Sequence, residues 1–245
     1  MNNLNDVASH YMPGAPTAIE NELILNWYPH RILSRLKECG TKSLLELGLG
    51  HGHTALIFNK FFRRHVVIEG SSVVIDLFKT KNKSLNIEII ESYFENYSTA
   101  EKFDAIVMGF VLEHIDDPGM VLDRFRQYLA PDGRLFVAVP NAKSLNRRLG
   151  VELGIINDIY DLNENDIAQG HQRQFCRATL KSFLGDHGFE VVWEEGIYLK
   201  PLPLGLLQQL PRFHDNLQAM LKVGIDFPDL CVGLLMEMRN QKSAS

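Results

Sequence analysis

Cysteine, excess positive charge and long apolar runs are scarce in this chain, and each absence excludes a class of protein. Its 245 residues include only three cysteines, Cys39, Cys176 and Cys231, which lie far apart and in no metal-binding spacing. That usage predicts reduced, mostly buried thiols in a cytosolic protein, and no metal site. The formal net charge of −5 lacks the basic excess typical of nucleic-acid binding, so no nucleic-acid partner is expected.

Membrane and targeting signals are also missing. No apolar run reaches the ~18 residues that a membrane-spanning helix needs. The first ten residues lack the basic-then-apolar pattern of a signal peptide, so we expect a cytoplasmic protein without a membrane span. A hydrophobic content of 45% and a charged content of 22% are ordinary for a folded domain. The length suits one large α/β domain.

Short apolar segments alternate with helical patterns along most of the chain. Strand-like segments rich in β-branched and apolar residues occur at 43–47, 65–68, 86–90, 103–109, 134–139, 189–194 and 230–238. Helices between such strands predict a parallel sheet of the doubly wound α/β class, covered on both faces. Ligands of such sheets bind at the carboxyl ends of the strands.

Two breaker signals lead to specific local predictions. Pro29 falls within a segment of helical spacing over 18–36, and we expect it to break or kink that segment into two helices. The sequence A-P-D-G at 130–133 is a strong turn signal. We therefore expect it to separate a helix over about 118–129 from the strand that follows.

The stretch 44–53, with the sequence L-L-E-L-G-L-G-H-G-H, is the centre of the predicted site. An apolar strand leads into Glu46, a helical pattern begins at Thr54, and three glycines alternate between them: Gly48, Gly50 and Gly52. Glycine tolerates φ > 0 and lets a ligand lie against the backbone. A dinucleotide loop of the form G-x-G-x-x-G would place glycine or alanine at His53. A ligand without a pyrophosphate therefore fits better, which disfavours a nicotinamide enzyme.

Candidate binding residues also end the next three strands. Glu69 follows about 20 residues after the loop, where an acid can accept both hydroxyls of a ribose; a solvated acid is the alternative. Ser92, Tyr93 and Phe94 end the third strand, where an aromatic ring can stack on adenine or belong to the core. Gly109 ends the fourth strand. All of these strand ends should meet at one rim of the sheet.

Four segments, in order, resemble successive motifs of the class I S-adenosylmethionine (SAM) dependent methyltransferases. They read E-L-G-L-G-H-G, V-I-E-G, E-K-F-D-A-I-V-M-G-F-V-L-E-H-I-D-D-P and L-A-P-D-G-R-L-F-V-A-V-P-N. The resemblance is strong over about 40–142 and looser over 170–191. It implies a seven-stranded, mostly parallel Rossmann-like sheet with an antiparallel last strand. It also implies SAM as cofactor, S-adenosyl-L-homocysteine as product, and a small-molecule or peptide acceptor.

The resemblance carries cofactor roles onto residues at the strand ends: Glu46, Gly48, Gly50, Glu69, Gly70, Ser71, Ser92, Tyr93, Phe94, Gly109 and Phe110. Glu46 and the first glycines match positions around the methionine part of SAM, and Glu69 matches the ribose acid. Ser92 stands where many members have aspartate, which leaves the contact to the adenine amino group open. In some members a tyrosine of the N-terminal arm closes over the cofactor. Tyr11 could take that role here or be a solvated residue.

Two histidines and an arginine are the candidates for handling the acceptor. His114 follows the fourth strand, and His171 lies in a polar segment beyond the core. Each could act as the general base that a hydroxyl acceptor needs, or be purely structural. Arg173 could bind an anionic group of the acceptor, or lie solvated at the surface.

The remaining segments define the expected organisation of a single domain over 1–245. Residues 1–40 form an N-terminal arm and helices, and 41–142 form the SAM-binding core. The insertions 143–175 and 197–228 are expected to form a helical cap over the acceptor pocket. A homodimer interface is the competing use of the leucine-rich second insertion.

We therefore predict a methyltransferase that moves the sulfonium methyl to an oxygen nucleophile of a small molecule or peptide, either a hydroxyl or a carboxylate. Transfer to an amine nitrogen is the next alternative. A SAM-binding protein without transferase activity is the third. The motifs that can be recognised all serve the cofactor, so the acceptor itself is not predicted.

Overall fold

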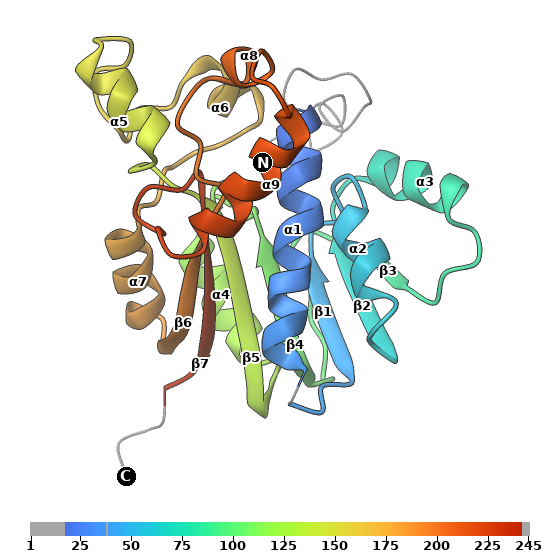
Figure 1. Cartoon of the computed structure of the whole chain (residues 1–245). Helices are drawn as coiled ribbons and strands as arrows, with labels where there is room; N and C mark the ends of the chain where they lie inside the picture. Colours follow the sequence, from blue (N-terminus) through green and yellow to red (C-terminus); the bar gives the residue numbers. More distant parts are fainter. Residues whose placement is uncertain (1–17, 38, 242–245) are drawn as a thin grey trace.

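A seven-stranded sheet runs through the centre of the molecule (Figure 1). The computed structural model describes residues 18–37 and 39–241. The strand order is β3-β2-β1-β4-β5-β7-β6. The strands are β1 (Ser43–Leu47), β2 (Arg64–Glu69), β3 (Glu88–Glu91), β4 (Phe103–Gly109), β5 (Leu129–Pro140), β6 (Phe189–Ile197) and β7 (Gly233–Asn240). Strands β1 to β5 pair in parallel, and β7 is antiparallel to both β5 and β6. The predicted Rossmann-like topology is confirmed.

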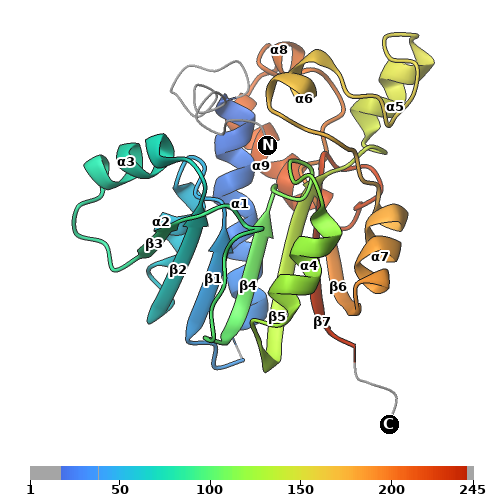
Figure 2. The ribbon, with the colours of Figure 1, turned by 180° about the vertical axis from the view of Figure 1, so that it is seen from behind.

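Helices cover both faces of this sheet (Figures 1 and 2). They are α1 (Ala18–Leu36), α2 (His53–Phe58), α3 (Ser72–Lys81), α4 (Pro118–Arg126), α5 (Leu145–Glu152), α6 (Glu164–Ala168), α7 (Arg177–Asp186), α8 (Leu204–Leu207) and α9 (Phe213–Gly224). Helices α1 and α9 pack on one face, and α4 and α7 pack on the other. Among the described helices, none has the length and apolar character needed to cross a bilayer.

The strands are buried on both faces because each one sends alternate side chains into two different cores. In β5, Leu135 and Val137 join the core under α4 and α7, whereas Phe136 and Ala138 join the core under α1 and α9. This two-residue alternation follows from strand geometry. It explains why the strands read as continuous apolar runs in the sequence.

Helix α1 corrects the prediction that Pro29 divides this region into two helices. The helix runs unbroken through Pro29 from Ala18 to Leu36. Ile24, Tyr28 and Ile32 are buried at four-residue spacing on both sides of the proline. An interior proline costs about 3 kcal/mol, and burying a continuous row of large side chains outweighs that cost.

The turn predicted at 130–133 lies inside β5, so that prediction is wrong about where the strand begins. Phe103 of β4 pairs with Leu129, and Ala105 pairs with Arg134, so the extra residues form a bulge. Gly133 fits there because a Cβ would lie 3.0 Å from the carbonyl oxygens of Ala130 and Phe103. The A-P-D-G turn signal thus falls on a bulge within β5, and the strand starts before it.

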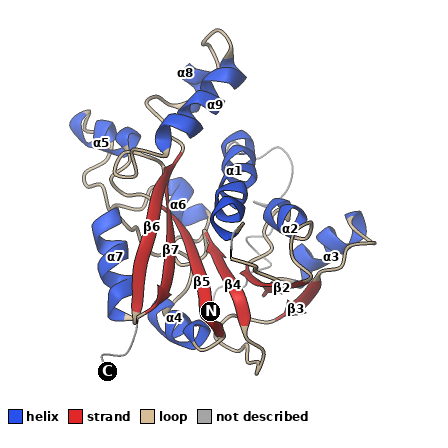
Figure 3. Ribbon diagram, turned by 60° about the horizontal axis from the view of Figure 1, so that its bottom comes forward, coloured by secondary structure: helices blue, strands red, loops and turns tan. Residues whose placement is uncertain are grey.

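The two insertions lie beyond the carboxyl ends of the parallel strands. Figure 1 shows α5, α6 and α8 above the strand tips, and Figure 3 shows the sheet as one layer between the helices. Helix α9 of the second insertion packs with α1 through Leu217 and Leu221, which share a buried cluster with Ile24. The domain divisions drawn from the sequence, and the role of the insertions as a lid, stay predictions.

Candidate functional site

A cleft of about 660 Å³ opens at the carboxyl ends of the strands. One wall is formed by the glycine loop and the tips of β2 and β4. The opposite wall comes from α1 and from the two insertions, through residues such as Ser144, Asp166, His171 and Lys200. Most of the residues predicted from the sequence to act on a ligand lie along this one cleft.

The glycine loop after β1 is a sequence of left-handed turns. Gly48, Gly50 and Gly52 have φ values of +81°, +48° and +77°, as the sequence predicted. A Cβ at Gly52 would overlap the Phe78 ring, and a Cβ at Gly48 would lie 3.1 Å from Val111 Cγ1. Glycine is required at position 52 for two reasons, because φ is positive there and because there is no room for a Cβ. The turn leaves the loop backbone facing the cleft.

Glu69 is held in place by two backbone N–H groups. Leu49 N donates to its Oε2 at 2.9 Å, and Ser71 N donates to its Oε1 at 2.8 Å. The residue is 8% exposed and lines the cleft beside Gly70. A carboxylate has about four acceptor sites, so it can still accept hydrogen bonds from ligand hydroxyls. These two bonds orient the carboxylate. Its role as the ribose acid stays a prediction.

Glu46 lies beneath the glycine loop and is not among the described residues that line the cleft. The Thr54 hydroxyl donates to its Oε1, and His65 Nε2 lies 3.0 Å from its Oε2. Thr54 does line the cleft and sits in the first turn of α2. Glu46 therefore supports the loop through Thr54. The contact with the methionine part of the ligand that was predicted for Glu46 would have to pass through this neighbour.

Of the residues predicted at the adenine end, Phe94 lines the cleft. Ser92 and Tyr93 do not, and the Ser92 hydroxyl donates to the Tyr93 carbonyl at 2.9 Å. Ser71 also lies outside the lining and caps α3, where its hydroxyl accepts from Val74 N. These three predictions stay untested, and only Phe94 is placed to stack on a ligand directly.

Gly109 and Phe110 lie in the floor of the cleft, at the end of β4. A Cβ at Gly109 would overlap the hydroxyl of Tyr28, a buried residue of α1 that lines the cleft but that the sequence analysis did not single out. Phe110 has a φ of +57° and packs edge-to-face against Tyr28, with ring centroids 5.7 Å apart. Tyr11 lies outside the described residues.

Glu113, which sequence reasoning passed over in favour of its neighbour, is the most unusual residue of the cleft. It is 1% exposed, and neither carboxylate oxygen has a hydrogen-bond partner among the described residues. Burial raises the pKa of Glu113 to about 7, although the nearby His171 opposes that shift. The pair E-H in V-L-E-H-I was the available signal. What singles out the acid is its burial, which the pattern does not show.

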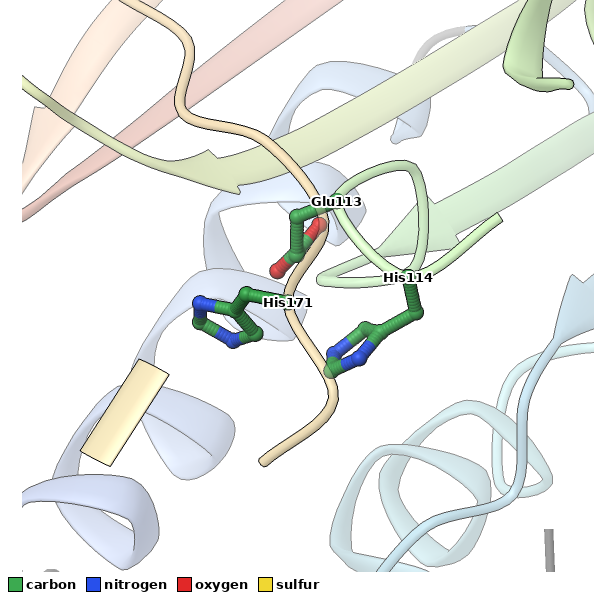
Figure 4. A group of neighbouring side chains, drawn as sticks. All are labelled: Glu113, His114 and His171. Carbon is green, nitrogen blue, oxygen red and sulfur yellow. The ribbon is translucent and has the colours of Figure 1, made fainter. Parts of the chain in front are cut away.

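The two predicted histidines meet at this acid (Figure 4). One ligating atom from each of Glu113, His114 and His171 falls within 4.8 Å of the others. The two imidazole rings are nearly perpendicular, with centroids 4.8 Å apart. Burial lowers the pKa of His114 to about 4, so this imidazole is neutral at pH 7. The loop after β4 and a distant segment of the chain thus bring together one carboxylate and two imidazoles, which can accept protons or bind a metal ion.

His171 is positioned by Asp166 and by the loop that carries Glu113. The His171 N–H donates to the Asp166 carbonyl at 2.9 Å, and Asp166 Oδ1 lies 3.4 Å from His171 Nδ1. Gln172 N donates to the Glu113 carbonyl at 2.8 Å, and the Gln172 amide donates to the His114 carbonyl at 2.7 Å. These bonds fix the second histidine against the first.

Arg173 does not line the cleft. Its guanidinium donates to the main-chain carbonyls of Leu112 at 3.0 Å, of Asp116 at 3.2 Å, and of Ile115. Its donors are therefore used to hold the loop after β4. The contact with an anionic acceptor that was predicted for Arg173 stays a prediction, and the hydrogen bonds seen here make Arg173 a positioning residue for the cluster.

A sequence model described as "Methyltransferase domain" matches residues 24–194, which is most of the chain. The chain belongs to the SAM-dependent methyltransferases. Two curated relatives agree with this assignment. (S)-Coclaurine N-methyltransferase of Papaver somniferum is 30% identical over 141 residues, which cover 55% of this chain and 39% of that protein. The mitochondrial ubiquinone biosynthesis O-methyltransferase of Dictyostelium discoideum is 27% identical over 126 residues, covering 50% and 37%.

These matches span well under half of the relatives' own length. A solved structure gives the fold over the whole chain. The N-methyltransferase NodS of Bradyrhizobium japonicum, crystallised with S-adenosyl-L-homocysteine, superposes with a TM-score of 0.61 at 18% identity. It covers 97% of this methyltransferase and 100% of its own chain.

The donor end of the cleft fits SAM. The glycine loop lines the cleft, and its close packing against Val111 and Phe78 leaves no room for a Cβ at Gly48 or Gly52. Its glycines do not have the G-x-G-x-x-G spacing of loops that bind a pyrophosphate. Gly48, Gly50, Glu69, Phe94 and Gly109 of this methyltransferase are the residues that would hold the cofactor.

Proposed function

We propose that this methyltransferase transfers the SAM methyl group to an oxygen nucleophile of a small molecule or peptide, with a hydroxyl as the preferred acceptor. The observation that supports it is the cluster of Glu113, His114 and His171 in the same cleft as the glycine loop and Glu69. When bound, SAM supplies a methyl on a positive sulfur, so that transfer makes a C–O bond and leaves the C–S electron pair on sulfur.

The three groups of the cluster do what a hydroxyl acceptor needs. A hydroxyl has to lose a proton, whereas a carboxylate needs only alignment and an amine needs to be neutral. A carboxylate and two imidazoles offer several acceptor atoms for that proton within 4.8 Å. Glu113 itself is 1% exposed, so its carboxylate is shielded from solvent. Arg173 and Gln172 keep the two halves of the cluster together.

Transfer to an amine nitrogen is the second candidate. It is favoured by one relative, the N-methyltransferase of Papaver somniferum, and by the unpartnered carboxylate of Glu113, which could hold an ammonium group. An ammonium group would also have to lose a proton before it could attack, and the imidazoles could accept that proton. We rank the amine below the oxygen acceptor because a neutral amine is a nucleophile without a base, whereas a hydroxyl depends on one.

A comparison of matched acceptors tests the choice. The purified protein is incubated with methyl-labelled SAM and pairs of aromatic compounds that differ only in carrying a hydroxyl or an amine. We expect label in the hydroxyl compounds, and a strong loss of labelling in His114→Gln and His171→Gln variants that still bind SAM in calorimetry. Label only in the amines would overturn the oxygen assignment. SAM binding without label in any compound, or in a cell extract, would favour a SAM-binding protein.

A further inference from the structure

We infer that Glu113, His114 and His171 bind a divalent transition-metal ion of the zinc class at the acceptor end of the cleft. The inference deepens the proposed function and rests on it for the ion's role. The sequence predicted no metal site, because its cysteines have no metal-binding spacing and His171 lies far along the chain from Glu113 and His114. The site itself stands on geometry that is independent of the acceptor.

The first observation is a buried carboxylate without a partner. Both oxygens of Glu113 lack a hydrogen bond among the described residues, at 1% exposure. An uncompensated buried carboxylate costs several kcal/mol, so native proteins pair such groups with a cation or with donors. Glu113 is thus positioned for a cation that the chain does not supply.

The cations of the cleft are engaged elsewhere. Of the described lining residues, Arg147 and Lys200 carry positive charge. Lys200 pairs with Glu20 at 2.8 Å, and Arg147 pairs with Asp166 at 3.2 Å. Arg173, which lies behind the cluster, spends its donors on main-chain carbonyls. No described arginine or lysine of this region is therefore directed at the Glu113 oxygens.

The second observation is the donor set. Two imidazoles and one carboxylate are the three protein ligands of open zinc sites, in which the fourth position is left for water or substrate. Ligand atoms around one ion at ~2.1 Å stand about 3–4 Å apart. The three ligand atoms lie within 4.8 Å of one another, so the side chains would have to draw closer to hold one ion.

The third observation is a carboxylate behind one of the histidines. Asp166 Oδ1 lies 3.4 Å from His171 Nδ1. A carboxylate in this place favours a proton on Nδ1 and leaves the Nε2 lone pair for a metal, which is the usual second partner of metal-bound histidine. Asp166 is itself held, since its other oxygen accepts from Asn163 N at 3.0 Å and pairs with Arg147. The main-chain bond of His171 to the Asp166 carbonyl places the residue beside this carboxylate, although Nδ1 has no hydrogen bond among the described residues.

In the proposed reaction the ion would bind the acceptor hydroxyl through its open position. A divalent ion lowers the pKa of a bound hydroxyl group, as zinc lowers that of water to about 7. Side chains that hold the ion cannot also take the proton, so with an ion bound the proton would pass to water instead, and the oxygen would keep its electron pair as the nucleophile. The chain's own part is to hold the ion in the same cleft as the glycine loop.

Titration with Co²⁺ alone tests the site without reference to activity. The full-length protein is stripped with a chelator and titrated while the visible absorption of four- or five-coordinate Co²⁺ is followed, and Zn²⁺ is then added in competition. We expect one ion per chain and displacement by Zn²⁺. The Glu113→Gln and His171→Gln variants should bind on the order of 100-fold more weakly. Asp166→Asn, which keeps the shape of the side chain, should bind about 10-fold more weakly.

The control is His30→Gln, a histidine on the exposed face of α1, which should leave the titration unchanged. Circular dichroism and SAM calorimetry establish that each variant is folded. A wild-type protein that shows no saturable Co²⁺ spectrum, or a Glu113→Gln protein that binds like the wild type, would overturn the site. A saturable site with no methylation of any hydroxyl compound would leave the metal site intact and reject the proposed function instead.

Discussion

The two ends of the cleft treat their buried acids in opposite ways. At the donor end, Glu69 accepts from two backbone N–H groups, and Glu46 is bonded to Thr54 and His65. At the acceptor end, Glu113 is equally buried, but its oxygens have no hydrogen-bond partner among the described residues. At the donor end the buried carboxylates have their hydrogen-bond partners before a ligand binds. At the acceptor end the buried carboxylate would gain its partner from a ligand. Satisfied groups orient a ligand common to the whole family, while an unsatisfied group selects what binds.

The largest effect should come from the loop that makes the donor end rigid. Gly52→Ala places a Cβ against Phe78 at a φ of +77°, so we expect it to lower the free energy of unfolding by about 2–4 kcal/mol. Gly40→Ala is the matched control, because it has a φ of +63° but no atom within 4 Å of the added Cβ. It should lose only about 1 kcal/mol in urea denaturation. Equal losses would show that crowding at the loop is unimportant.

The next effect tests whether the oriented carboxylate binds SAM. Glu69→Gln keeps the shape but removes a charged acceptor, so SAM affinity in calorimetry should fall by about 2–3 kcal/mol, or 30- to 150-fold. Glu91→Gln is the control, since Glu91 is paired with Glu69 in the sheet register but is exposed at the end of β3. It should bind SAM normally. Unchanged affinity in Glu69→Gln would remove the ribose role.

The third effect, at the acceptor end, should be a gain in stability rather than a loss. In chelator at pH 8, Glu113→Gln should raise the free energy of unfolding by about 1–3 kcal/mol, because the wild type must keep an unpartnered charge buried. Burial raises the pKa of Glu113 from 4.5 to about 7. Stability of the wild type therefore falls as pH rises through that window, and the gain should vanish toward pH 4.5. A loss of stability at pH 8 would mean that the carboxylate is paired.

The smallest effect concerns Asp104, a carboxylate at the end of the sheet away from the cleft, which serves as a reference for Glu113. Asp104 accepts from Lys42 N at 2.8 Å and from Ser43 N at 2.9 Å. Partial burial raises its pKa, but these hydrogen bonds outweigh burial and lower it. The stabilisation is present at neutral pH and is lost as pH falls through the lowered pKa. Asp104→Asn should thus cost about 1 kcal/mol at pH 7 and less at pH 3, a pH trend opposite to that of Glu113.

The position of the glycine loop beside Glu69 could be predicted from the sequence because its signals are local. Alternating glycines at 48, 50 and 52 permit a left-handed backbone, and an acid at the tip of the next strand falls beside them in a parallel sheet. The mostly parallel sheet followed from the alternation of strands and helices along the chain. These features need only neighbours in the chain, which a pattern can show.

The errors and omissions depend on packing between distant segments. Pro29 did not end its helix because a buried row on both sides of it holds the helix together. Glu113 was not singled out, because only its neighbour His114 has a side chain that suggests a general base. Its burial depends on segments far apart in the sequence: the segment around Gln172 and Arg173 bonds to the loop after β4 that carries Glu113. Long-range burial of this kind leaves no periodic trace in a sequence.

Arg173 has a consequence for how the protein opens and closes in solution. One guanidinium joins the carbonyls of Leu112 and Asp116 to the segment that carries His171. The Gln172 N–H bonds to Glu113 across the same junction. Segments closed by shared bonds open as one cooperative unit. The amides of 112–116 and 170–174 should therefore exchange their hydrogens for deuterium at a common rate, slower when an ion or acceptor is bound, while the glycine loop exchanges independently of both.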